Sequence, residues 1–161
     1  MNMKMHRVFL FFALFATSCA PSEVKVDMNF PTTAAFMHSE QGRLRVFRLM
    51  QSDLGICPEL LDGVSTANFP SRAQLAFDSE LASVCSFLQS ADVPGIGEGP
   101  HAYLAEMRSA SNEVILQGCR VGEIYVDAPD VRIELQPTNA YDAVRGMPVT
   151  GTPMSRCGAT P

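Results

Sequence analysis

Residues 113–135, EVILQGCRVGEIYVDAPDVRIEL, decide the fold class of this chain. This stretch contains three short runs rich in branched residues, at 113–116, 121–126 and 131–135. Glycines and the pair Pro129–Asp130 punctuate the runs, as turn residues between strands do. In the last run apolar and charged residues alternate, which is the pattern of a strand with one buried face. The second half of the chain is therefore predicted to form short, mostly antiparallel strands.

A similar pattern lies much earlier in the chain. Residues 24–30, VKVDMNF, alternate apolar and polar side chains without an error. This alternation predicts another half-buried strand. It would begin the folded domain, because the residues before it are not patterned.

The centre of the chain reads as helical. In residues 39–54, Val46, Phe47, Met50 and Leu54 share one side at helical spacing, and Gly55 supplies a stop. A strand over residues 43–50 is the alternative, because this stretch is short and rich in branched residues.

Two further helices are predicted downstream. Ser71 and Gln74 have the spacing of a capping box, and an apolar stripe from Phe77 to Leu88 follows. A shorter helix is expected after Pro100, and a helical turn within 139–145. The last fifteen residues read as an irregular tail pinned by Cys157. Together these elements predict an α+β fold: one small domain over residues 24–161, with a mainly antiparallel sheet, two to three helices and two disulfides.

The first residues have the layout of an export signal. Lys4 and Arg7 precede nine apolar residues, VFLFFALFA at 8–16. A positive segment followed by a short apolar run is typical of a secretory signal peptide. The run is less than half the roughly 20 residues that a membrane-spanning helix needs. Residues 1–18 are therefore predicted to be a signal peptide.

The residues that end this signal, ATSCA at 16–20, resemble the lipobox of bacterial lipoproteins, although Ala16 stands where leucine is commonest. The resemblance implies that Cys19 becomes the first residue and carries the lipid, palmitate included, with residues 19–23 as a short tether. Ala20 implies sorting to the outer membrane, facing the periplasm, if the envelope is Gram-negative; a Gram-positive envelope stays open. The alternative is ordinary signal-peptidase cleavage, which would leave Cys19 as a free thiol.

Cysteine parity supports lipidation. The chain has five cysteines. In an oxidising compartment an even number should pair, and lipidation of Cys19 leaves four. Four cysteines allow three disulfide pairings. We favour Cys57–Cys85 with Cys119–Cys157, because each disulfide would then link elements within one half of the chain. Zinc is disfavoured because its ligands come in closely spaced pairs, and no metal or cofactor is predicted.

Charge narrows the class of partner. Without Lys4 and Arg7, ten basic residues face seventeen acidic ones. An acidic domain with no basic run repels phosphate backbones, so no nucleic acid is expected as a partner.

No sequence motif indicates catalysis. GxSxG, HExxH and P-loop patterns are absent from the sequence. His101 could act as a general base beside Glu98 or Glu106. Met37–His38, with Met28 or Met50 nearby, could bind a soft metal such as copper, although methionine more often fills core gaps. We therefore expect an envelope lipoprotein that is not an enzyme, attached to the membrane by its lipid and binding another envelope protein. An inhibitor or immunity-type lipoprotein and a small hydrolase are the alternatives.

Overall fold

A computed structural model describes residues 24–50, 53, 55–125 and 130–158 of the protein. The expected signal peptide (1–18), the lipidated Cys19 and the tether (19–23) lie outside these described residues. Within them, no helix is long and apolar enough to cross a bilayer.

The larger sheet is built around two long strands. β6 (Gly99–Arg108) pairs with β7 (Val114–Ile124) over nearly their whole lengths. The strand order is β3-β2-β6-β7-β9, every pair is antiparallel, and β4 pairs with β2 beside β3. The remaining strands of this sheet are β2 (Gln41–Leu49), β3 (Ala73–Asp78), β4 (Ala82–Ser83) and β9 (Gln136–Pro137).

The smaller sheet has the order β5-β1-β8 in the described part of the chain. β1 (Val24–Asn29) pairs antiparallel with β5 (Ala91–Val93) and parallel with β8 (Val131–Glu134). The alternating patterns at 24–30 and 131–135 therefore do mark strands, as the sequence predicts. Their apolar residues point toward the larger sheet, since Val26 and Ile133 are fully buried.

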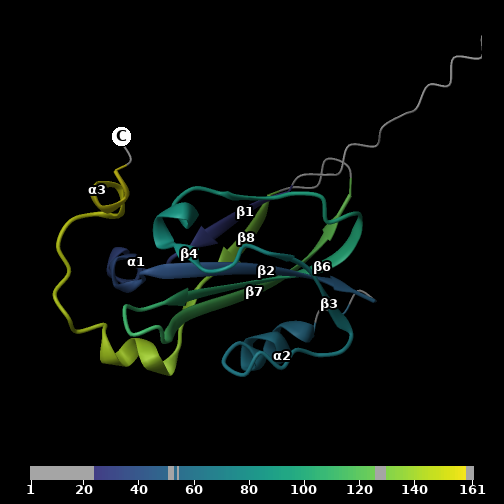
Figure 1. The fold of residues 1–161 in the computed structure, drawn as a ribbon, viewed down its shortest axis with the longest axis horizontal. Coiled ribbons are helices and arrows are strands. Elements are labelled where there is room, and N and C mark those ends of the chain that lie inside the picture. Colours follow the sequence, from purple (N-terminus) through teal and green to yellow (C-terminus); the bar gives the residue numbers. More distant parts are fainter. Residues whose placement is uncertain (1–23, 51–52, 54, 126–129, 159–161) are drawn as a thin grey trace, which may run out of the picture.

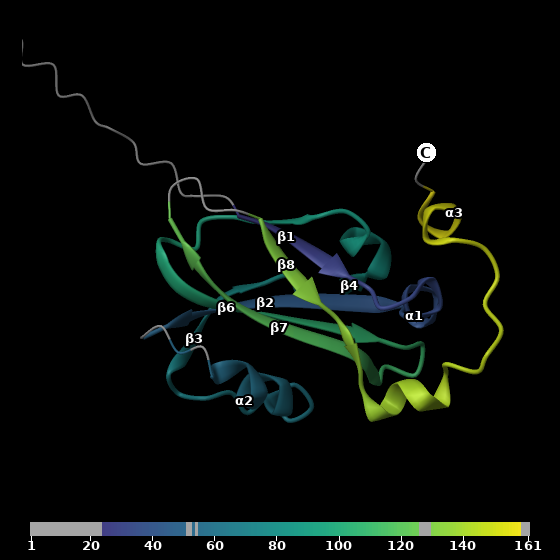
Figure 2. The same cartoon turned by 180° about the vertical axis from the view of Figure 1, so that it is seen from behind.

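Both faces of the larger sheet are covered, by different elements. Figures 1 and 2 show β1 and β8 on one face and α2 (Ile56–Gly63) on the other. Leu44, Val46 and Tyr103 belong to the core shared with the smaller sheet, α1 (Thr33–His38) and the 3-10 helix η1 (Val84–Phe87). Phe47 and Leu104 pack under α2. The central strands are therefore apolar on both sides.

This two-sided burial explains why the helix prediction over 39–54 is wrong. Val46 and Phe47 are consecutive residues of β2, and each is buried on a different face of the sheet. A strand buried on both faces loses its alternation and can imitate helical spacing. The strand alternative over 43–50 is the correct one. The same cause explains β6, where residues 102–107 are all buried and a short helix was expected.

The helix expected from Ser71 to Leu88 is also wrong. This stretch forms β3, β4 and η1 instead. The Asp78 carboxylate accepts a hydrogen bond from the Glu80 backbone N–H at 2.9 Å, and Glu80 has a positive φ of 57°. This local turn lets the chain leave β3 and rejoin β2 through β4.

The helices that do form are short. α1, α2 and α3 (Pro153–Cys157) were not located by the sequence patterns, although their number fits the expected two to three for the described residues. The 3-10 helix η2 (Asn139–Ala143) confirms the helical turn predicted within 139–145. The α+β fold class, with a mainly antiparallel sheet, is confirmed.

The two disulfides found in the described residues are Cys57–Cys119 and Cys85–Cys157. The favoured pairing of Cys57 with Cys85 and of Cys119 with Cys157 is therefore wrong. Cys57 lies on α2 and Cys119 on β7, so the first bond fastens the helix to the sheet it covers. The pairing follows the contacts between distant segments and not the division of the chain into halves.

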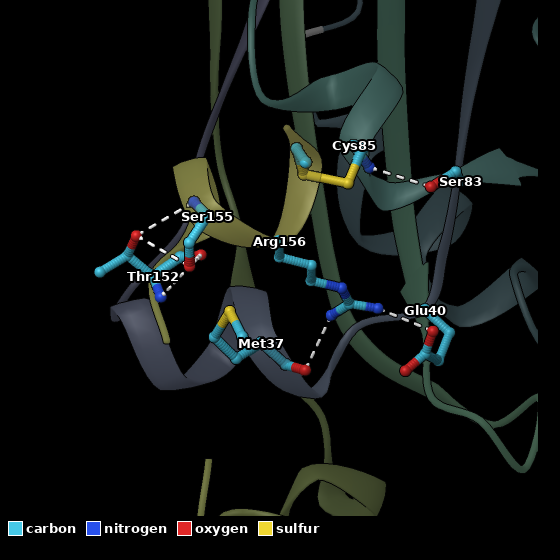
Figure 3. The surroundings of a disulfide bond; sticks show 8 residues. Met37, Glu40, Ser83, Cys85, Thr152, Ser155 and Arg156 are labelled. Atoms are coloured by element: carbon cyan, nitrogen blue, oxygen red, sulfur yellow. Dashed lines mark hydrogen bonds and ion pairs between the residues drawn. A yellow bond between two sulfur atoms is a disulfide. The ribbon is translucent and has the colours of Figure 1, made fainter. Parts of the chain in front are cut away.

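The second disulfide holds the C-terminal segment, as expected of Cys157. Between η2 and α3 the chain loops outward from the sheets (Figure 2) and returns beside α1. There the Arg156 guanidinium donates to the Met37 carbonyl at 2.9 Å and to the Glu40 carboxylate at 2.7 Å (Figure 3). The disulfide and the two hydrogen bonds of Arg156 thus hold α3 in place, although α3 has no buried residues of its own.

Candidate functional site

One edge of the larger sheet is open along part of β7. β9 pairs with β7 through Leu116↔Pro137 and Gln117↔Gln136, and no other described strand continues this pairing. The Thr138 N–H donates to the Ile115 carbonyl at 2.9 Å, so this carbonyl points away from β6. Ile115 lies at the single shift in register between β6 and β7, and from Leu116 to Ile124 the register is regular. In a regular antiparallel ladder every second residue points the same way. The N–H and C=O groups of Cys119, Val121 and Glu123 therefore face the open side.

Gly118 marks the place where this open edge begins. A Cβ at Gly118 would lie 2.6 Å from the Glu134 carbonyl oxygen and 2.7 Å from the Ile133 side chain. Real Cβ atoms do not approach a backbone oxygen so closely, so β8 can cross β7 here because residue 118 is glycine. Beyond this crossing β7 and β8 are not paired with each other.

A groove of about 450 Å³ lies along the unpaired part of β7. It is lined from β7 and β8 by Arg120, Val121, Gly122, Glu123, Tyr125, Asp130, Val131, Arg132 and Glu134. Tyr125 is 52% exposed, and Glu134 accepts a hydrogen bond from the Asn29 side chain at 2.6 Å. The groove thus combines backbone hydrogen-bonding groups with two arginines and three carboxylates.

The arginines of this groove differ from most basic residues of the folded domain. Six of the ten basic side chains form ion pairs with described carboxylates. Arg120 and Arg132 are not among those six, and both line the groove. Among the described residues, neither of these two guanidinium groups has a carboxylate partner in an ion pair, although the domain has an excess of acidic residues.

A second charged cluster lies on the α2 side of the larger sheet. Glu106 receives hydrogen bonds from Arg45 at 2.6 Å and from Arg108 at 2.9 and 3.0 Å. Arg43 pairs with Asp78 at 2.8 Å beside them, and this hydrogen bond lowers the pKa of Asp78 below its usual value. Burial lowers the pKa of Arg45, and the charge of Glu106 opposes that effect. Because both carboxylates of this cluster are engaged by arginines of the same cluster, we assign it to stability.

His101 is placed where it does not reach solvent. It lies on β6, is fully buried, and donates from Nδ1 to the Gly99 carbonyl at 2.8 Å. Burial lowers its pKa, against the hydrogen bond to Gly99. Glu106 is an odd number of residues away on the same strand, so it points to the opposite face. The structure therefore does not bring together the His101 and Glu106 of the general-base hypothesis.

Only some of the residues considered for a soft-metal site lie close together in the structure. Met37 and His38, at the end of α1, line a groove of about 520 Å³ together with Met147. Met50, at the far end of β2, is 79% exposed. Among the described residues, no three His, Cys, Asp or Glu side chains could hold a metal ion together.

Comparison with known proteins identified no relative of this chain. No protein-family model matches the chain, and no curated protein or solved structure is significantly similar to it. The groove residues Arg120, Gly122 and Arg132 were not singled out as a site from the sequence. Their pattern indicates strands, but nothing in it indicates which strand edge stays open.

Proposed function

We propose that this chain is a bacterial envelope lipoprotein, anchored through Cys19, that binds another envelope protein without catalysing a reaction. The groove beside β7 is the binding site in this proposal. Its unpaired backbone groups carry the proposal, because they are hydrogen-bonding groups that a second polypeptide can satisfy.

The anchor is supported by the cysteine pairs. Cys57, Cys85, Cys119 and Cys157 pair with one another. Cys19 is then the one cysteine left over, directly after the apolar run at 8–16. Lipidation gives this thiol a use in an oxidising compartment. Two or more acyl chains would hold the protein at the membrane without any other apolar segment.

The mass of the intact native protein tests the anchor. The protein would be extracted in detergent and alkylated before and after reduction. We expect a chain that starts at Cys19, carries added acyl mass, and reacts with alkylating reagent at four thiols after reduction and at none before. A chain cut at the same place without acyl mass would contradict the anchor.

Binding is tested in intact cells. A tagged chain would be cross-linked in the cell, purified under denaturing conditions and analysed by mass spectrometry, with an unrelated tagged lipoprotein as the control. We expect one envelope protein to be enriched reproducibly over that control. Repeated failure to enrich any protein would contradict the binding role.

The acidic balance favours a second candidate, an inhibitor or immunity-type lipoprotein. Ten basic residues against seventeen acidic ones would attract a basic toxin or wall-degrading enzyme. Survival of cells with and without the gene, challenged with lysozymes and rival toxins, tests it. Equal survival under every challenge would contradict this candidate and leave the first one standing.

A further inference from the structure

We infer that the partner binds as an extended segment that adds a strand to β7 at Cys119, Val121 and Glu123, with an acidic side chain meeting Arg120. This inference rests on the proposed binding role and specifies how the partner is recognised. It follows from the arrangement of the backbone, from the comparison of the sheet edges, and from the charges in the groove.

The backbone argument concerns spacing. Residues of β7 that face the open side recur every second position, which is about 6.6–6.8 Å along a strand. Each of them presents one donor and one acceptor. Another polypeptide in extended conformation has donors and acceptors at the same spacing. It can therefore form hydrogen bonds with all of these β7 groups in one continuous ladder. A small molecule has no such repeat.

The open part of β7 is long and regularly paired on its other side. The register of β7 with β6 has one shift, between Met107 and Arg108, and runs without a shift from Met107↔Leu116 to Gly99↔Ile124. On the opposite edge, β3 has a register shift between Val46 and Phe47 of its partner strand, which leaves Ala76 without a partner. Bulges of this kind protect edges from pairing. β5 has three residues and offers a much shorter edge.

Arg120, and not the overall charge of the groove, selects among extended segments. Arg120 is exposed and lies on the same face of β7 as Gly122, whose Cβ would be 3.8 Å from the Val131 side chain. A strand added to β7 would alternate its side chains, and every second one would pass over this side. An acidic residue at such a position would meet the guanidinium of Arg120, which has no described carboxylate as a partner.

Proline substitution tests the ladder with little cost to the fold. The N–H of Val121 faces away from β6. Val121→Pro therefore removes a hydrogen-bond donor from the open edge without removing a hydrogen bond between β7 and β6. Val121→Ala is the matched control, because it shortens the same side chain and keeps the N–H. A photo-reactive residue at Glu123, in the full anchored chain, would report contact in intact cells. The same residue at Leu75 on β3 is the control for position.

We expect one envelope protein to be captured from position 123 and not from 75. Its yield should fall by about tenfold or more in Val121→Pro, because the hydrogen bonds of the added strand depend on that backbone. The yield should fall less in Val121→Ala than in Val121→Pro, and it should be reduced in Arg120→Ser. Capture that persists in Val121→Pro would overturn strand addition while leaving the binding role intact. Capture from position 75 alone would overturn the choice of β7. No capture from either position would contradict the binding role itself.

Hydrogen exchange keeps the test valid if Val121→Pro does not fold. In the unmodified protein, the amides of Cys119, Val121 and Glu123 should exchange fast, and those of Arg120 and Gly122 slowly, because the latter bond to β6. Addition of the captured partner should protect the first group by at least tenfold. Unchanged exchange at these three amides in the complex would overturn strand addition.

Discussion

Arg45 and Glu106 form an ion pair with a 2.6 Å contact in which both side chains are almost fully buried, at 5% and 1% exposure. They extend from the neighbouring strands β2 and β6, and the ring of Phe69 covers the guanidinium at 4.5 Å. A buried charge that loses its partner keeps the cost of its desolvation. The stability of this face of the sheet therefore depends on the pair being complete.

Replacement of Glu106 by Gln should accordingly be costly. We expect the free energy of unfolding, measured by urea titration, to fall by about 3–5 kcal/mol, because Arg45 would be left buried without its anion. Asp142→Asn is the control, since it removes the exposed pair with Arg145 and should cost less than about 1 kcal/mol. Equal costs for the two variants would show that the buried pair is not needed.

Gly118 and Gly122 offer a matched pair on one strand. Gly118→Ala should lower the free energy of unfolding by about 1–3 kcal/mol, because the new Cβ would meet the Glu134 carbonyl and β8 would have to shift. At Gly122 the nearest atoms to a Cβ are 3.6 and 3.8 Å away, which is ordinary contact. Gly122→Ala should therefore be tolerated. Thermal or urea unfolding of both variants measures the difference, and similar losses would contradict the crossing of β7 and β8 at residue 118.

The two disulfides should differ in what they protect. They span 62 and 72 residues, so loop entropy predicts similar contributions, about 4 kcal/mol each. Cys57→Ala with Cys119→Ala should loosen α2, which covers the sheet. Cys85→Ala with Cys157→Ala should release α3, which has no buried residues.

Limited proteolysis distinguishes these effects. In the second double variant, early cleavage is expected in residues 144–153, before any cut in the sheets. In the first, cuts should appear around α2 while the C-terminal segment stays protected. Identical digestion patterns would contradict these separate roles, and non-reducing peptide mapping of the native protein checks the pairing itself.

Acid should weaken the fold in two steps. Burial holds the pKa of His101 below its ordinary 6.5, so below that pH the unfolded chain takes up a proton that the folded chain refuses. Stability therefore falls as pH drops through the interval just below 6.5. Asp78, whose pKa lies below 3.8 because Arg43 donates to it, contributes stability that is lost at more acidic pH.

Variants separate the two steps. In His101→Gln the dependence on pH just below 6.5 should flatten, and the loss below about pH 4 should remain. Asp78→Asn should show the reverse. Urea titrations from pH 7 to pH 3 measure both slopes, and a first step that is unchanged in His101→Gln would mean that another group causes it.

Local patterns in the sequence were reliable where one face of a strand is buried. The runs at 24–30 and 131–135 alternate because they lie in the smaller sheet, which has one face toward the core, and both were predicted as strands. The same reasoning failed for β2 and β6. In these strands both faces are covered, so the alternation on which the prediction depends is absent.

The sequence alone determined the α+β class, the strands with a single buried face, and the presence of disulfides among four cysteines. Export with a lipid at Cys19 stays a prediction. These depend on composition and on neighbours a few residues apart. The tertiary structure decided that Cys57 pairs with Cys119 and Cys85 with Cys157, that Arg45 and Glu106 meet, and that His101 is buried. It also decided that no strand in the described part of the chain pairs with β7 beside Arg120. Each of these depends on contacts between residues far apart in the chain, which local periodicity does not record.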